Sequence, residues 1–432
     1  MGQYPTGPLR CWGKAKELRD NYYRDYQSAP ARGALRIGGS AWAFSAVPEG
    51  LGEVQWLTGE PYGASCAFNK DFSVQCMEAA EKKGYARDLC AYMRNYWGSI
   101  LIGKYAFGGE FPKPDFLFTS HICCSHAKWY QVAGELEGDT PFFGVDVSVG
   151  PHDKITPHGV RYVVGQLEDA IEWMERITKR RYDDSRLIEA VHTEAEAMSL
   201  WASICQLNRT VPAPLDEKTM YALYVFGVIM KHRPEVLAFY RELYDEVKDR
   251  VARGIAACAN EHIRLITDTQ PPWGFLDIFR HMEKYGAVSV GSLYTYGLAG
   301  MWDFPDGDMV PKATPRQLGQ ELCTRADALE AIVRWTLCRP EYQHFFNPGI
   351  KTDLMLRIIR NWKVDGAILH YNRGCEGLSL GIAQNRMELV AAGVPVTVFE
   401  GNMGDEREFD HGRTLERIDS FLETMGLRKL EK

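Results

Sequence analysis

The sequence lacks a long apolar run. The most extended one, from Tyr221 to Met230, is interrupted by a glycine, and a membrane-spanning helix needs about 20 apolar residues. The first 16 residues, MGQYPTGPLRCWGKAK, contain no apolar core of the length that a signal peptide requires. We therefore expect a cytoplasmic protein that does not enter a membrane.

The chain also lacks clustered charge and closely paired cysteines. Its net charge of −7 is spread over 432 residues without long blocks of one sign, which argues against a nucleic-acid partner because such binding needs a clustered basic footprint. The 11 cysteines include no CxxC pair, so zinc-ribbon and ferredoxin signatures are excluded. An odd number of cysteines without a signal peptide indicates reduced thiols that serve metals or catalysis.

No nucleotide-binding motif is complete. Residues 98–104 match the pattern GxxxxGK, but Tyr105 follows where a phosphate-binding loop needs Ser or Thr for magnesium. The glycines at Gly38 and Gly39 do not have the GxGxxG spacing of a dinucleotide-binding turn. We therefore expect neither a phosphate-binding loop nor a dinucleotide-binding turn at these positions.

What the sequence does contain is an alternation of short apolar strands and amphipathic helices, which predicts parallel sheets. The fold class is α/β, with two Rossmann-like or flavodoxin-like parallel-sheet domains and a helical connecting region. The predicted domains are residues 1–160, a helical region at 161–261, and a second α/β domain at 262–432. The expected strands cover residues 34–38, 115–121, 142–147, 263–267, 287–290, 366–371 and 394–400.

Cysteines follow two of these strands. Cys123 and Cys124 come just after the strand at 115–121, and Cys375 comes just after the strand at 366–371. Ligands in open α/β sheets gather at the carboxyl ends of strands. Cys90 stands at the start of a predicted helix, where the thiolate form is favoured. Spacing alone does not decide whether these cysteines bind a metal or pack in the core, because free cysteines are often buried as small hydrophobic residues.

Seven segments spread over most of the chain stand out: Ala46–Glu49, Leu57–Gly59, Cys124–Trp129, Ile368–Cys375, Gly393–Pro395, Glu400–Asp405 and Arg417–Phe421. Together they resemble the 2-hydroxyacyl-CoA dehydratase and benzoyl-CoA reductase family. The resemblance implies that three cysteines, Cys90, Cys124 and Cys375, hold an iron–sulfur cluster. Ser125 stands where the family often has Asp, and the adjacent Cys123 leaves the choice of ligand open. Cys124 is favoured because the interval from Cys124 to Lys128 then matches the spacing downstream of the cysteine in the family.

Within this family, the segments HICCSHAKWYQ and CWGKAKELRDNYY are most similar to B-type subunits of benzoyl-CoA reductases. That likeness implies an oxidoreductase subunit with a [4Fe–4S] cluster, or a larger fused cluster, that reduces the ring of benzoyl-CoA to a cyclic dienoyl-CoA. The implied partners are benzoyl-CoA or a related acyl-CoA, a homologous smaller cluster subunit, and ATPase subunits that activate the electron. Two alternatives stay open: a 2-hydroxyacyl-CoA dehydratase subunit, which is a lyase, and a non-catalytic subunit that only relays electrons.

The resemblance also suggests which residues surround the substrate. His126 is the candidate catalytic proton donor, and Ser40, Trp42 and Glu49 are candidates to line the substrate pocket. Each has a simpler reading, as a surface, capping, core or helix first-turn residue. The phosphates of coenzyme A could be bound by basic residues, either at Lys14, Lys16 and Arg19 or at Lys179, Arg180 and Arg181. We expect the acyl end to reach the cleft between the two α/β domains.

Overall fold

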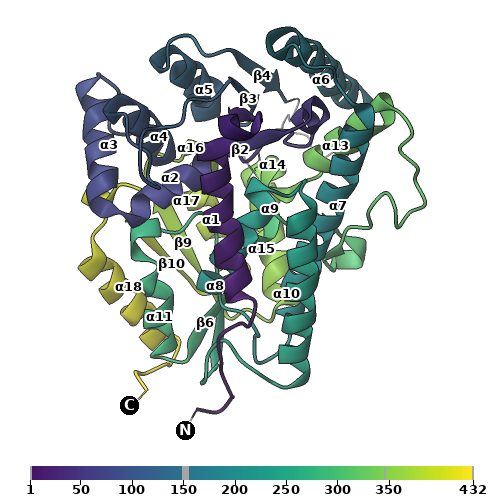
Figure 1. The fold of residues 1–432 in the computed structure, drawn as a ribbon. Helices are drawn as coiled ribbons and strands as arrows, with labels where there is room; N and C mark the ends of the chain where they lie inside the picture. Colours follow the sequence, from purple (N-terminus) through teal and green to yellow (C-terminus); the bar gives the residue numbers. More distant parts are fainter. Residues whose placement is uncertain (1, 148–154, 345–346, 431–432) are drawn as a thin grey trace.

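Two four-stranded parallel sheets organise the molecule (Figure 1). The computed structural model describes residues 2–147, 155–344 and 347–430. The first sheet lies in the upper part of Figure 1 and the second below it, and long helices flank both. This arrangement confirms the predicted α/β class with two parallel sheets.

The first sheet has the strand order β2-β1-β3-β4. Gly39, at the end of β1, explains part of its close packing: a Cβ atom there would lie 2.3 Å from the Phe118 carbonyl oxygen and 2.5 Å from the Trp56 ring. Only glycine fits between the neighbouring strands at this point. The strands are β1 (Leu35–Gly39), β2 (Val54–Thr58), β3 (Phe116–His121) and β4 (Phe142–Asp146).

The second sheet has the order β10-β9-β5-β6, again all parallel. Its central strands are buried along nearly their whole length, as expected when helices cover both faces. The strands are β5 (Ile263–Thr267), β6 (Ala287–Ser292), β9 (Gly366–Asn372) and β10 (Val396–Gly401). A short antiparallel pair, β7 (Trp302–Asp303) and β8 (Val310–Pro311), lies outside both sheets.

The helices fall into three groups along the chain. Those of the first part are α1 (Trp12–Ser28), α2 (Gly59–Phe68), α3 (Lys70–Lys82), α4 (Ala91–Ile102) and α5 (Cys124–Leu136). Those of the middle are α6 (Pro157–Thr178), α7 (Asp184–Leu207), α8 (Glu217–Tyr224), α9 (Phe226–Ile229) and α10 (Pro234–Ala252). Those of the last part are α11 (Asp277–Glu283), α12 (Leu293–Gly297), α13 (Arg325–Leu337), α14 (Pro340–His344), α15 (Pro348–Asn361), α16 (Glu376–Ser379), α17 (Ile382–Ala391) and α18 (His411–Thr424).

The middle region is helical, as the sequence predicts, and its long helices α7 and α10 run beside each other (Figure 1). The apolar positions 222, 225, 226 and 229 predict a helix that ends near Pro234, but α9 already ends at Ile229, and Pro234 begins α10. Proline is tolerated there because the backbone N–H of the first helical residue has no hydrogen-bond acceptor within the helix. Thr156 caps α6 by accepting from the Gly159 amide.

Candidate active site

Three cysteines from separate parts of the chain line one small cavity. Cys90 is the N-cap of α4, Cys123 is the N-cap of α5, and Cys375 follows the end of β9. The cavity has a volume of about 40 Å³, and its lining includes Trp42 and Met403. The carboxyl ends of β3 and β9 thus meet here, one from each sheet, as expected for open α/β folds.

The structure distinguishes Cys123 from Cys124. Cys123 has extended backbone angles (φ −146°, ψ 169°) and lines the cavity. Cys124 is the first residue of α5, is exposed, and is not among the lining residues. Family spacing favoured Cys124, but two consecutive residues at a strand-to-helix turn point in different directions. Of the two adjacent cysteines, only Cys123 therefore lines the cavity together with Cys90 and Cys375.

The buried thiols resist ionisation unless a cation is present. Burial raises the pKa of Cys375 to about 11. Burial also raises the pKa of Cys90 well above its ordinary value, and the neighbouring Cys375 adds to that rise. Two thiolates in one buried cavity repel each other, so a bound metal centre would supply the missing positive charge. The donor set fits a centre that prefers sulfur ligands.

The described part of the chain contains no preformed site for a single metal ion. Among residues 2–147, 155–344 and 347–430, no group of three or more His, Cys, Asp or Glu side chains is arranged to hold a single metal ion. A single zinc needs all its sulfur ligands within about 2.3 Å of one point. The thiolates of an iron–sulfur cluster instead bind different irons, so they stand further apart.

His126 and Glu60 form a buried pair at the edge of the cavity. His126 Nε2 lies 2.6 Å from Glu60 Oε1, and both side chains are about 5% exposed. Burial opposes protonation, but the Cys123 thiolate and the Glu60 carboxylate outweigh it and raise the pKa of His126 to about 10. Burial by itself would raise the pKa of the Cys123 thiol, but the neighbouring His126 holds that pKa below its ordinary value.

Glu60 is a site residue that the sequence pattern did not reveal. It lies in the first turn of α2, directly after β2, and its Oε2 accepts the Ala41 amide at 2.9 Å. Residues 54–58 were not recognised as a strand, so the acidic residue after them was not seen as a strand-end group. The signal was available in Val54-Gln-Trp-Leu-Thr58, a short run of apolar and β-branched residues that precedes a glycine.

A second, larger pocket adjoins the cysteine cavity. Its volume is about 280 Å³, and it shares Glu60, Tyr92 and Tyr294 with the cavity. Its walls are largely aromatic, and its more exposed members include Arg19 and Phe68. The aromatic lining consists of Tyr23, Phe68, Tyr92, Tyr221, Tyr224, Trp273 and Tyr294. An apolar pocket with few polar groups is the usual form of a small-molecule site.

The other predicted site residues have different places. Trp42 lines the cysteine cavity. Ser40 is buried beside it and accepts a hydrogen bond from Thr119 Oγ1 at 2.8 Å, but it is not among the lining residues. Glu49 lies elsewhere, in ion pairs with His232 at 3.1 Å and Arg233 at 3.0 Å. Glu49 therefore joins the first part of the chain to the helical region.

One of the two predicted basic clusters reaches a pocket. Arg19 lines the aromatic pocket and is joined there by Lys218 of α8. Arg180 instead donates to the backbone carbonyls of Gly33, Leu51 and Glu53. That guanidinium stabilises the loop before β2. No helix in the described residues has the length and apolar character needed to cross a membrane.

Comparisons with known proteins place the whole arrangement in context. A family model described as "2-hydroxyglutaryl-CoA dehydratase, D-component" matches residues 42–425. The (R)-2-hydroxyisocaproyl-CoA dehydratase alpha subunit of Clostridioides difficile is 27% identical, with 90% of each chain covered. The (R)-phenyllactyl-CoA dehydratase alpha subunit of Clostridium sporogenes is 23% identical, also over 90% of each chain. A benzoyl-CoA reductase subunit of Thauera aromatica is 23% identical, over 81% of this chain and 79% of its own. The specific likeness to benzoyl-CoA reductase is thus no stronger than the likeness to dehydratases.

Proposed function

The chain belongs to the 2-hydroxyglutaryl-CoA dehydratase D-component family, and from this premise we propose that it is the catalytic, cluster-binding subunit of a 2-hydroxyacyl-CoA dehydratase. The substrate is a (2-hydroxyacyl)-CoA thioester, and the product is the corresponding enoyl-CoA. Relatives named as dehydratase alpha subunits, aligned along most of the chain, support a dehydratase rather than a reductase.

One observation carries the proposal: three thiols gather where an aromatic pocket ends. Cys90, Cys123 and Cys375 line the inner cavity, and the larger pocket joins it through Glu60, Tyr92 and Tyr294. A substrate in the pocket would therefore present one end to whatever the cysteines hold. We assign the three thiolates as ligands of an iron–sulfur cluster, which leaves an iron without a protein ligand if the cluster is [4Fe–4S].

The reaction removes the hydroxyl from carbon 2 and a hydrogen from carbon 3 as water. Cys90, Cys123 and Cys375 would hold the cluster, which, when bound, would supply the one electron that the reaction needs and recovers at its end. The chain's own contribution is proton handling. The Glu60 carboxylate can accept a proton at the inner end of the pocket, and His126, held 2.6 Å from it, can donate one to the leaving hydroxyl.

The aromatic pocket binds the thioester and keeps water away from the reacting carbon atoms. Tyr92, Tyr221 and Tyr294 are buried and form its inner walls. Arg19 and Lys218 provide positive charge among its more exposed lining residues, where the phosphates of coenzyme A would be bound. Excluding water also strengthens the electrostatic interactions of the buried pair.

The proposal includes other chains. The relatives are named as single subunits of larger enzymes. We propose a homologous smaller subunit as the partner and a separate ATP-hydrolysing protein as the electron donor, because neither GxxxxGK at residues 98–104 nor any other segment forms a complete nucleotide motif. Residues 98–102 lie within α4 rather than in a loop.

Turnover by the complex tests the proposal. The protein is purified anaerobically with its partner, reduced with ATP and its electron donor, and given either a (2-hydroxyacyl)-CoA or benzoyl-CoA. We expect enoyl-CoA from the first and no dienoyl-CoA from the second. Dienoyl-CoA as the main product would favour the reductase, which the aromatic walls and the Thauera aromatica relative also support. Neither product, with the cluster intact, would favour an electron-relay subunit.

A further inference from the structure

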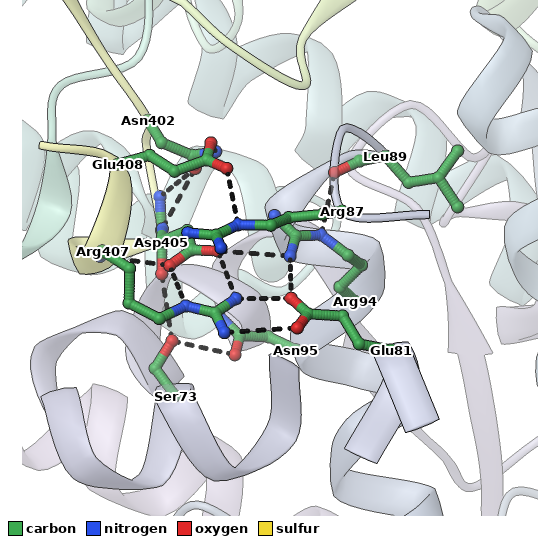
Figure 2. Close-up of polar contacts among 11 residues, drawn as sticks. Ser73, Glu81, Arg87, Leu89, Arg94, Asn95, Asn402, Asp405, Arg407 and Glu408 are labelled. Carbon is green, nitrogen blue, oxygen red and sulfur yellow. Dashed lines mark hydrogen bonds and ion pairs between the residues drawn. The ribbon is translucent and has the colours of Figure 1, made fainter. Parts of the chain in front are cut away.

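An ionic cluster with a buried centre joins the two halves of the molecule, one half around each parallel sheet (Figure 2). At its centre, Arg94 Nη1 of α4 lies 3.2 Å from Asp405 Oδ2, in the loop after β10. Both side chains are 0% exposed. Arg94 comes from the half that carries Cys90 and Cys123, and Asp405 from the half that carries Cys375.

Two further residues complete the central group. Arg407 donates to Asp405 at 2.7 Å and to Glu81 at 2.5 Å, and Glu81 also accepts from Arg94 at 3.3 Å. Two cations and two carboxylates thus alternate across the boundary (Figure 2). Removing one member of such a buried group leaves another charge without its partner, which costs more than the loss of an exposed pair.

Arg94 also reaches the peptide that leads into Cys90. Its Nε donates to the Leu89 carbonyl oxygen at 3.0 Å, while Arg94 itself stands four residues after Cys90 in the first turns of α4. The guanidinium therefore connects Asp405 in one half to the backbone just before a cavity cysteine in the other. Because the group is planar and rigid, these bonds fix direction as well as distance.

The Leu89 carbonyl also lies close to the loop that carries Cys375. A Cβ atom on Gly374 would lie 3.0 Å from the Leu89 oxygen, and Gly374 has a φ of +76°. The carbonyl of the residue before Cys90 therefore leaves little room for a side chain on the residue before Cys375. A side chain at position 374 would push the two loops apart.

The loop that carries Asp405 contacts the cavity too. Met403 lines it, and Asn402 Oδ1 accepts the amides of Gly404 and Asp405 at 3.0 Å each. Ser73 Oγ donates to the Gly404 carbonyl at 3.0 Å. The loop is thus held from both halves, and Asp405 has little freedom to follow Arg94 if the halves separate.

We propose that Arg94 and Asp405 are positioning residues: together they set the distance between Cys90 and Cys375 across the boundary between the two halves. The assignment of these thiols as cluster ligands rests on the proposed function, whereas their spacing does not. Groups that orient ligands typically change metal affinity about 10- to 100-fold when they are replaced. The pair acts through the Cys90 segment and does not touch the substrate.

The structure offers a matched control. Arg87 Nε lies 3.0 Å from Glu408 Oε1, so this pair also crosses between the halves, but the Arg87 side chain is 49% exposed. Exposed pairs contribute little to stability. Arg87→Gln therefore removes an ionic contact between the same two segments without removing the bond to the Leu89 carbonyl.

Thiol cross-linking of the metal-free full chain tests the proposal without any cluster. Dibromobimane bridges nearby thiols, and peptide mapping by mass spectrometry gives the rate for the Cys90–Cys375 bridge. We expect the bridging rate to fall about tenfold in Asp405→Asn. It should fall less in Arg94→Lys, because lysine keeps the charge but loses the planar fork. In the control Arg87→Gln it should stay within about twofold of the wild-type rate. Circular dichroism establishes that each variant is folded, and Arg94→Lys serves as the test if Asp405→Asn does not fold.

Iron loss supplies an independent second measurement. After anaerobic reconstitution, we expect Asp405→Asn to lose iron to a chelator about tenfold faster than wild type and Arg87→Gln. A folded Asp405→Asn variant that forms the bridge at the wild-type rate would overturn the inference. If wild type takes up no cluster but the cross-linking rates differ as expected, the inference stands and the proposed function fails. If wild type forms no Cys90–Cys375 bridge, both fail.

Discussion

Glu60 Oε1 and His126 Nε2 lie 2.6 Å apart at the point where the aromatic pocket meets the cysteine cavity. One residue follows β2 and the other lies in the first turns of α5, so two strand ends of the first sheet bring an acid and a base together. Such a pair can move a proton without moving a side chain far.

Replacement of Glu60 by Gln should lower turnover without removing the metal centre. The amide keeps the size of the side chain but cannot accept the substrate proton, and general acid–base groups contribute about 10²- to 10⁴-fold. Turnover number and iron content are measured together. Glu53→Gln is the control, because the Glu53 side chain is 67% exposed. Wild-type turnover in Glu60→Gln would remove Glu60 from the proposed chemistry.

Serine substitutions at two adjacent cysteines should have different effects. Cys123 lines the cavity, whereas Cys124 is exposed, so Cys123→Ser should lose most of the bound iron and Cys124→Ser should keep it. Replacing a metal ligand or its support lowers affinity by about 10-fold or more. Iron and acid-labile sulfide are measured after anaerobic purification. The opposite result would restore the ligand expected from the sequence.

Arg19→Gln should weaken acyl-CoA binding if the aromatic pocket is the entrance. Arg19 is an exposed member of the pocket lining, and an exposed ionic contact contributes about 0.2–1 kcal/mol. We therefore expect KM for the acyl-CoA to rise about threefold with kcat unchanged. Lys16→Gln, on the same helix but outside the pocket lining, should leave KM unchanged. Equal effects of both variants would indicate only a general loss of positive charge.

Glu217 should make stability fall as the pH rises. Burial raises the pKa of Glu217 from 4.5 to about 8, although Ser289, Thr267 and Tyr221 donate to it. The unfolded chain releases this proton near pH 4.5, so between pH 4.5 and 8 unfolding releases a proton. The free energy of unfolding then falls with rising pH by at most about 1.4 kcal/mol per pH unit from this group.

The Glu217→Gln variant isolates that contribution. Denaturant unfolding is measured at pH 5.5 and 7.5 for both proteins, and the difference between the two pH values should be smaller for the variant. Parallel pH dependence in wild type and Glu217→Gln would show that Glu217 is ionised in the folded protein.

Much of the fold could be predicted from sequence because buried strands leave a local pattern. The runs at 263–267 and 366–371 match β5 and β9 almost residue for residue. The strand β2 was missed, since Gln55 interrupts its short apolar run. The sequence pattern predicts a helix over residues 86–97, but α4 begins only at Ala91, because Cys90 has non-helical angles and acts as its N-cap.

The site was only partly predictable. Strand ends and a helix start pointed to Cys90 and Cys375, since those signals are local. The choice between Cys123 and Cys124 depends on which residue begins α5, and spacing does not contain that information. Glu49 is a candidate pocket residue by sequence, but tertiary contacts pair it with His232 and Arg233. The predicted domain boundaries at 160 and 261 stay a prediction.

The most direct test of the central claim is an iron anomalous-scattering map from crystals of the anaerobically prepared complex. We predict iron density in the cavity, bonded to the sulfurs of Cys90, Cys123 and Cys375, at the inner end of the aromatic pocket. Iron bound elsewhere on this chain, or a fully loaded active complex with no iron in this cavity, would contradict the account.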